Sequence, residues 1–158
     1  MDSLLPLRLV VLRPPAGTEF RLQRGRIGVG AGPTPIAPTH ATPDALTFDF
    51  TILLGAAPQS DGMPSLGGAF AHGTTRDRFI YVASGRPAAE GAPWQWDRRA
   101  KVPLVGITPE LVHELIDALS DDAGAVLEAR IAGSGADGRA VAARVGLLDG
   151  GWRVVPGR

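Results

Sequence analysis

Residues 46–52 read Leu46-Thr47-Phe48-Asp49-Phe50-Thr51-Ile52. Apolar and polar side chains alternate along this stretch, and a period of two residues is typical of a β-strand with one buried face. Further aliphatic or alternating runs occupy residues 5–13, 20–29, 78–84, 94–105, 126–132, 139–147 and 152–155, and residues 68–72 also resemble a short strand. The sequence therefore predicts a mainly β protein with seven or eight strands.

The segments between these runs determine how the strands connect. The chain holds 21 Gly and 14 Pro, which cluster between the β-like runs, and two long loops are expected at residues 30–45 and 55–67. Most of the other connections are too short for a helical crossover, so successive strands are expected to pair antiparallel. The fold class predicted is α+β and mainly β, either a small antiparallel β-barrel or a curled sheet with one packed helix.

That helix is expected over about residues 108–120. Thr108 is a favourable N-cap, and Pro109 suits the first helical position because its missing N–H has no partner there in any case. An apolar stripe with helical spacing follows, formed by Leu111, Val112, Leu115, Ile116 and Leu119. A length of 158 residues favours a single domain over residues 1–158.

Composition argues against several functional classes. Sixteen basic and sixteen acidic residues cancel, which argues against a nucleic-acid binder. The chain has no cysteine, so neither disulfides nor thiolate ligands are available. We expect no metal site and no cofactor. We also expect no membrane association, since no apolar run approaches the length of a membrane span. Absence of a signal-peptide pattern predicts a cytoplasmic protein, and fifteen arginines against one lysine indicate a genome rich in G and C.

The densest chemistry lies in residues 94–101, which read Trp94-Gln95-Trp96-Asp97-Arg98-Arg99-Ala100-Lys101. Strict alternation would place Arg99 and Lys101 on one strand face and Arg98 with the two tryptophans on the other. If Trp94, Trp96 and Tyr81 line a cavity, Arg98 can hold a carboxylate or enolate there. The alternative is that the tryptophans are core and the cations protect an edge strand. Pro103 favours either an edge position or a bulge near the end of that strand.

A second group of candidates surrounds the turn at residues 73–77. His72 is suited to act as a general base near neutral pH, although a hydrogen-bonded histidine at a strand end is the alternative interpretation. We predict His72, Asp77, Tyr81 and Lys101 as catalytic residues. The predicted ligand-binding residues are Arg78, Trp94, Trp96, Arg98 and Arg99.

Three segments resemble one known family: residues 68–73 (Gly-Ala-Phe-Ala-His-Gly), 77–82 (Asp-Arg-Phe-Ile-Tyr-Val) and 98–104 (Arg-Arg-Ala-Lys-Val-Pro-Leu). They are similar to the Arg-Phe-Ile-Tyr and Arg-Arg-Ala-Lys strands of an uncharacterised, largely actinobacterial family of unknown function. The resemblance covers residues 46–107, with weaker agreement to about residue 148. It departs after the tyrosine, where that family tends to have Ser-Trp-Gly and this chain has Ala83-Ser84-Gly85. The family implies no reaction.

The leading hypothesis is a small-molecule site inside the sheet or at its mouth, for an organic ligand that is anionic or aromatic. As an enzyme, the protein would perform cofactor-independent cyclisation, isomerisation or proton transfer. His72, Asp77 or Tyr81 would move the proton, and Arg98, Arg99 or Lys101 would stabilise the developing negative charge. The alternatives are a protein–protein interaction module without catalytic activity and a self-associating domain, and a homodimer is left open.

Overall fold

The computed structural model describes residues 3–24, 35–55, 64–73, 77–87, 94–134 and 146–157, without the side chains of residues 86–87 and 94–97. Its elements follow in the order β1 (Ser3–Leu12), β2 (Glu19–Leu22), β3 (His40–Ala41), β4 (Ala45–Leu54), β5 (Leu66–Gly67), β6 (Phe79–Pro87), β7 (Trp94–Pro103), α1 (Pro109–Ala118), β8 (Ala125–Ala132) and β9 (Leu148–Pro156). The protein is mainly β with one helix in these ranges, as the sequence predicts.

The larger sheet has the strand order β3-β4-β1-β8-β9, and β5 also pairs with β4. The central strand β1 is antiparallel to β4 and parallel to β8. Leu7 lies opposite Phe50 on one side and Leu127 on the other, and all three side chains are buried. The alternation expected for residues 46–52 is confirmed, because Phe48, Phe50 and Ile52 are buried whereas Asp49 and Thr51 are exposed.

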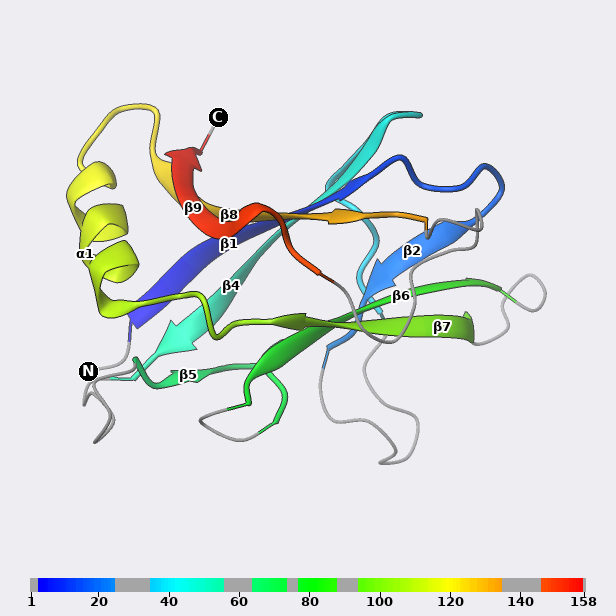
Figure 1. Ribbon diagram of the computed structural model, residues 1–158, viewed down its shortest axis with the longest axis horizontal. Coiled ribbons are helices and arrows are strands. Elements are labelled where there is room, and N and C mark those ends of the chain that lie inside the picture. Colours follow the sequence, from blue (N-terminus) through cyan, green and yellow to red (C-terminus); the bar gives the residue numbers. More distant parts are fainter. Residues whose placement is uncertain are drawn as a thin grey trace.

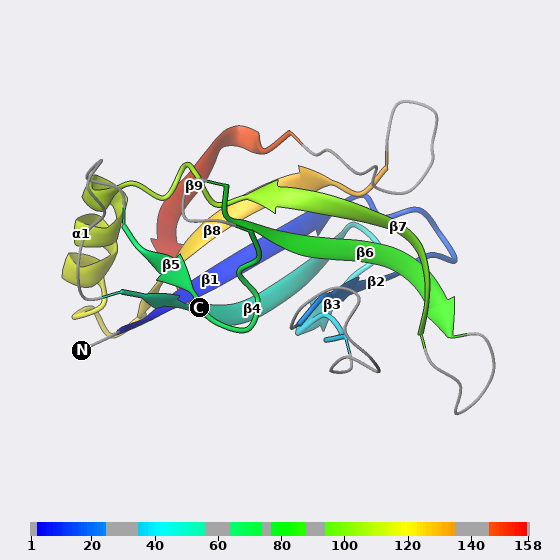
Figure 2. The same ribbon diagram turned by 90° about the horizontal axis from the view of Figure 1, so that it is seen from below.

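The smaller sheet has the strand order β2-β6-β7. It lies below β1, β4 and β8 in Figure 1 and in front of them in Figure 2, so the molecule has two layers. Ile80 and Val82 of β6 lie opposite Val102 and Ala100 of β7, and all four are fully buried in the core between the layers. The other face of the smaller sheet points away from that core, toward the viewer in Figure 2.

Helix α1 closes one end of the two layers (Figure 1). The expected cap is present, because the Leu111 N–H donates to Thr108 Oγ1 at 3.3 Å and Pro109 occupies the first turn. Val112 and Leu115 are buried in the common core. Ile116 and Leu119, which the sequence assigns to the same buried stripe, are instead 54% and 44% exposed. The helix covers only the end of the core, so the apolar stripe is wider than the surface it contacts. Within the described ranges no helix is long and apolar enough to cross a bilayer.

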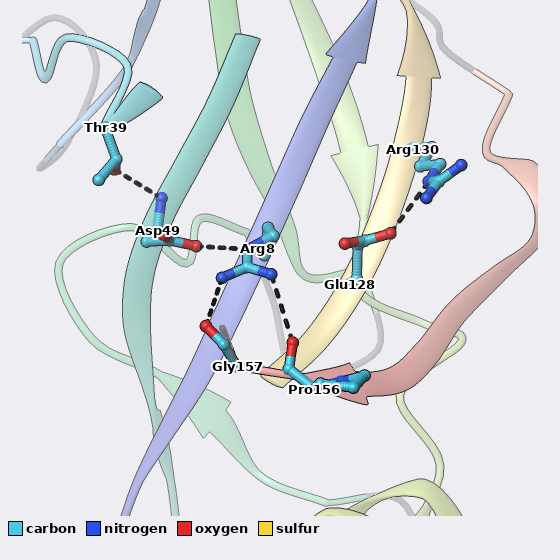
Figure 3. Close-up of polar contacts among 7 residues, drawn as sticks. All are labelled: Arg8, Thr39, Asp49, Glu128, Arg130, Pro156 and Gly157. Atoms are coloured by element: carbon cyan, nitrogen blue, oxygen red, sulfur yellow. Dashed lines mark hydrogen bonds and ion pairs between the residues drawn. The ribbon is translucent and has the colours of Figure 1, made fainter. Parts of the chain in front are cut away.

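The outward face of the larger sheet carries a row of matched charges, of which Figure 3 draws Asp49, Arg8 and Glu128. Arg8 of β1 lies opposite Asp49 of β4 and Glu128 of β8, and Glu128 lies opposite Arg153 of β9. Arg8 Nε donates to Asp49 Oδ1 at 2.8 Å, and Glu128 Oε1 lies 2.9 Å from Arg130 Nε and 3.5 Å from Arg153. Glu128 is only 6% exposed, and the two arginines offset the free-energy cost of burying its carboxylate.

The same arginine also fixes the end of the last strand. Arg8 donates from one terminal nitrogen to the carbonyl of Gly157 at 2.8 Å and from the other to that of Pro156 at 3.4 Å (Figure 3). On its other side, Asp49 is held through its backbone N–H, which donates to Thr39 Oγ1 at 2.9 Å. One guanidinium therefore connects β4, β1 and the chain after β9.

Two parts of the predicted topology are corrected by the structure. The curled sheet with one packed helix is confirmed, but the sheets do not close into a barrel. The expectation that strands pair antiparallel is wrong for β1 and β8, which pair in parallel over residues 7–12 and 127–132. Short connections constrain only neighbours in sequence, whereas β1 and β8 are joined by more than a hundred residues that include a helix and the whole smaller sheet.

The predicted loops and short strands also need correction. The interval 30–45 contains β3 and a bridge between Ile36 and Leu22, and the interval 55–67 contains β5. Residues 68–72 do not form the expected strand, since only His72 pairs, in an isolated bridge with Phe79. The residues 139–145 of the expected strand 139–147 lie outside the described ranges, and β9 begins at Leu148. The edge position favoured by Pro103 is confirmed, because β7 lies at one edge of its sheet and ends at Pro103.

We predict that Leu7→Ala lowers the free energy of unfolding by about 2–5 kcal/mol, because it leaves a cavity between Phe50 and Leu127 at the centre of the larger sheet. Urea denaturation measures this loss. Leu4→Ala is the matched control, since Leu4 is on the same strand but 62% exposed, and it should change stability by less than about 0.5 kcal/mol. Equal effects of the two substitutions would contradict the register of β1.

Candidate functional site

The outward face of the smaller sheet brings together many of the residues that the sequence singles out. Strand pairing defines three successive rows across β2, β6 and β7. Arg21, Ala83 and Arg99 form one row, Gln23, Tyr81 and Lys101 form the next, and His72, Phe79 and Pro103 form the third. In the last row His72 takes the place of a β2 residue, because its backbone N–H and carbonyl both bond to Phe79.

Three rings form the floor of this face. The Phe79 and Tyr81 centroids are 4.7 Å apart in an edge-to-face arrangement, and the His72 ring lies 5.2 Å from Tyr81 and 6.0 Å from Phe79. Phe79 is only 8% exposed. Ring pairs in this geometry contribute more than their buried area alone, so the three side chains hold one another in place.

Two cations lie over these rings. The Arg99 guanidinium carbon is 5.6 Å from the Tyr81 centroid, and Lys101 Nζ is 4.6 Å from the Phe79 centroid. Each contact runs diagonally between β7 and β6, which is within reach for long side chains on one sheet face. Within the residues that the structure describes, neither cation has a carboxylate within ion-pair distance. We call Phe79, Tyr81, His72, Arg99 and Lys101 together the aromatic–cationic face.

The turn that carries His72 depends on a glycine. Gly73 has φ +91°, and a Cβ added there would collide with the Asp77 carbonyl oxygen and would meet a Phe79 ring carbon at 2.9 Å. Only a residue without a side chain allows the chain to fold back this tightly against Phe79. Gly73 thereby holds His72 beside the aromatic rings.

Burial changes the protonation of His72. Loss of solvent lowers the pKa of the imidazole below 6.5; a hydrogen bond to the Gln23 backbone raises it, and the positive charge of Arg78 lowers it further. The burial effect is the largest of the three, so the ring is neutral at pH 7. Its Nε2 atom is buried and has no hydrogen-bond partner in the described part of the chain. His72 therefore carries a neutral imidazole whose Nε2 is buried and unpartnered within the described ranges.

The other predicted site residues are placed less favourably. Asp77 is exposed in the turn, and no hydrogen bond or ion pair joins it to the face in the described ranges. Arg78 bonds weakly to the Ala71 carbonyl, at 3.5 Å, and its buried Nε is unpartnered. Arg98 lies opposite Ser84, on the side of the sheet that carries Val82 and Ala100, and its side chain is exposed. Tyr81 lies opposite Lys101, so Tyr81 and Arg98 lie on different faces of the sheet. A cavity lined by both residues would require them to share one face.

The alternation expected through the two tryptophans is interrupted. The register shifts after Ser84, with Arg98 opposite Ser84 and Trp96 opposite Gly85, so one residue of β7 bulges out of the pairing. A bulge of this kind leaves one residue unpaired and bends the strand locally. The side chains of Trp94 and Trp96 lie outside what the structure describes, so their assignment as ligand-binding residues stays a prediction.

Two residues of the site are missing from the sequence analysis. Phe79 alternates with Tyr81 in the Arg-Phe-Ile-Tyr segment, and that spacing would have placed both rings on one face. Gln23 is only 8% exposed and its Oε1 is unpartnered, but nothing in the sequence around it distinguishes it from a surface residue. In the described ranges no three His, Asp or Glu side chains gather as ligands for a metal ion.

Fold and site together define a two-layer, mainly β protein with one helix that carries an aromatic and cationic surface on its smaller sheet. The chain belongs to the family of unknown function DUF5990, which matches residues 5–155. The match extends well beyond the segment 46–107 on which the family resemblance was based, and it confirms an uncharacterised family. Comparison with curated proteins and with solved structures finds no match.

We predict that His72 titrates below pH 6.5 and that its protonation destabilises the fold. The folded-state pKa is lower than that of the unfolded chain, so the contribution of His72 to stability is complete above pH 6.5 and declines as the pH falls toward the folded-state pKa. Proton NMR of the imidazole gives the midpoint, and denaturation at pH 7.5 and 5.5 gives the loss.

Two substitutions serve as comparisons. His72→Gln should reduce the difference in stability between the two pH values, whereas His113→Gln, at an exposed position of α1, should leave it unchanged. A His72 midpoint above 6.5 would show that the ring is not desolvated as the structure indicates.

Proposed function

We propose that the protein binds a small organic anion on the aromatic–cationic face. The observation that supports this most directly is that Arg99 and Lys101 lie over the Tyr81 and Phe79 rings without a carboxylate partner in the described residues. Two like charges two residues apart on one strand repel each other, and a bound anion relieves that repulsion. Because the rings already orient both cations, a ligand has to order less of the protein when it binds.

The site differs in position from the one expected at the sequence level. An interior or mouth of a barrel would require an open space between the layers, but the inward residues of both sheets belong to one buried apolar cluster. An aromatic carboxylate suits the outward face instead, because its carboxylate can contact Lys101 while its ring stacks on the planar Arg99 guanidinium.

The same arrangement supports a cofactor-independent enzyme that transfers a proton. In such a reaction the free Nε2 of neutral His72 takes a proton from a carbon next to a carbonyl or carboxylate and returns it to a different position of the substrate. Lys101 or Arg99 stabilises the negative charge that develops on the oxygen in between. The neutral state of His72 at pH 7 supports this proton-transfer reaction. The reaction begins with binding of the anionic substrate to the face.

Binding can be followed at single residues, because Lys101 is the only lysine and Tyr81 the only tyrosine of the chain. We predict that benzoate shifts the NMR signal of isotopically labelled Lys101 and the fluorine signal of 3-fluorotyrosine at position 81. Lys101→Ala and Arg99→Ala should each raise the dissociation constant about threefold to fivefold, since exposed charge pairs contribute at most about 1 kcal/mol.

Arg98→Ala is the matched control. It removes the same charge from the neighbouring residue, which lies on the other side of the sheet, and it should leave the dissociation constant within about twofold of the wild-type value. If Arg98→Ala weakens binding as much as Arg99→Ala, or if the Tyr81 signal does not move, the face is not the binding site.

A second candidate function, association with another protein, has its own observation. Ile116 and Leu119 are exposed on consecutive turns of α1, and Glu110, Glu114 and Asp117 are exposed on the same helix. An apolar pair bordered by charges is a common docking feature. If this helix mediates a homodimer, Ile116→Ser will shift the sedimentation coefficient to that of a monomer without altering benzoate binding; a protein that sediments as a monomer before substitution would exclude the homodimer.

A further inference from the structure

Beside the aromatic–cationic face, two buried hydrogen-bonding atoms lie on adjacent residues. Gln23 follows β2 and pairs through its backbone N–H with the Tyr81 carbonyl at 3.0 Å, and the His72 ring hydrogen bonds to the Gln23 backbone. Gln23 Oε1 and His72 Nε2 are both buried and have no partner in the described ranges. In folded proteins nearly all buried polar atoms have a partner, so two on neighbouring residues indicate a place where a polar group binds.

Both atoms are hydrogen-bond acceptors. Gln23 Oε1 is a carbonyl oxygen. The bond between the imidazole and the Gln23 backbone favours a protonated ring, so the ring donates in that bond to the backbone carbonyl. In a neutral imidazole only one nitrogen carries a proton, and Nε2 is then the one that accepts. The complementary group therefore supplies N–H or O–H donors.

The charge near these atoms further restricts the ligand. The positive charge of Arg78 acts on His72, and Lys101 lies in the same row as Gln23, with Tyr81 between them. An ammonium or amidinium group would be repelled there, so the donor group is uncharged. Neighbouring strands are about 4.8 Å apart, which puts the Gln23 and Lys101 backbones about 10 Å from each other. One substituted aromatic ring, together with the two side chains, spans that separation.

We propose that Gln23 and His72 accept hydrogen bonds from an uncharged N–H group of the bound ligand, and that the ligand is an organic acid that also carries a primary carboxamide. The carboxamide supplies two N–H donors, one for each acceptor. This inference rests on the proposed binding of an anion at Arg99 and Lys101, and it adds a second recognition element about one aromatic ring away from that charge.

The test compares two ligands of nearly the same shape. In carbamoylbenzoate and acetylbenzoate, substituted at position 3 or 4, the NH₂ of one replaces the CH₃ of the other, and the carboxylate and the carbonyl are common to both. Followed at labelled Lys101, at least one carbamoylbenzoate should bind about fivefold to tenfold more tightly than the matching acetylbenzoate. Benzoate itself measures the anion site alone.

Two variants locate the effect. Gln23→Met keeps the size of the side chain and removes Oε1, and His72→Phe keeps an aromatic ring beside Phe79 and Tyr81 and removes Nε2. Each should reduce the preference for the carbamoyl ligand. In Gln23→Met, which lies outside the aromatic–cationic face, the dissociation constant of benzoate should also stay within about twofold of the wild-type value, and this unchanged binding shows that the variant is folded.

The outcomes separate the two proposals. If benzoate binds but the carbamoyl and acetyl ligands bind equally, the carboxamide inference is overturned and the anion site stands. If the preference persists in both variants, the donor group is held elsewhere and the inference is also overturned. If neither benzoate nor any substituted benzoate binds, both proposals are overturned.

Discussion

The structure depends on the placement of β1 between one antiparallel and one parallel neighbour. Leu5, Leu7 and Leu9 point into the core in register with buried residues of β4, and the last two also with buried residues of β8. A shift of one residue would bury Arg8 and expose these leucines, because side chains alternate strictly along a strand. The ion pair between Arg8 and Asp49 reinforces the same register from the outward face. Between β1 and its parallel neighbour β8 the chain leaves the larger sheet twice, first for β2 and then, after β3, β4 and β5, in a crossover that carries β6, β7 and α1.

That crossover determines which surface is free for function. The smaller sheet packs its inward residues, among them Ile80 and Val102, into the common core, so chemistry can develop only on its outward positions. Those positions carry Phe79, Tyr81, Arg99 and Lys101. The turn at Gly73 then returns the chain so that His72 completes the same surface. The aromatic–cationic face is therefore a direct consequence of the alternation in β6 and β7, together with one tight turn.

Much of this organisation could be predicted from the sequence where local physics decides it. The alternation at 46–52, the Thr108 cap and the edge position of β7 all depend on residues close together in the chain. So does the placement of Arg99 and Lys101 on one face. The parallel pairing of β1 and β8 could not be predicted, because it joins residues more than a hundred positions apart. The exposure of Ile116 depends on how much of the core α1 covers, and the burial of Gln23 depends on contact with His72, neither of which leaves a local pattern.

The two outward faces of this molecule differ in how their cations are paired, although Arg21 on the smaller sheet also has a carboxylate partner, Glu19, at 3.0 Å. On the larger sheet Asp49, Arg8, Glu128 and Arg153 alternate in sign across four adjacent strands. On the smaller sheet Arg99 and Lys101 contact aromatic rings instead of carboxylates in the described ranges. The one lysine of the chain, Lys101, lies on the face of the smaller sheet, two residues from Arg99. Acidic residues equal basic ones in number, so carboxylates for a second matched row exist in the chain. Within the described residues none of these carboxylates pairs with Arg99 or Lys101, and the proposed binding of an anion rests on that difference between the two faces.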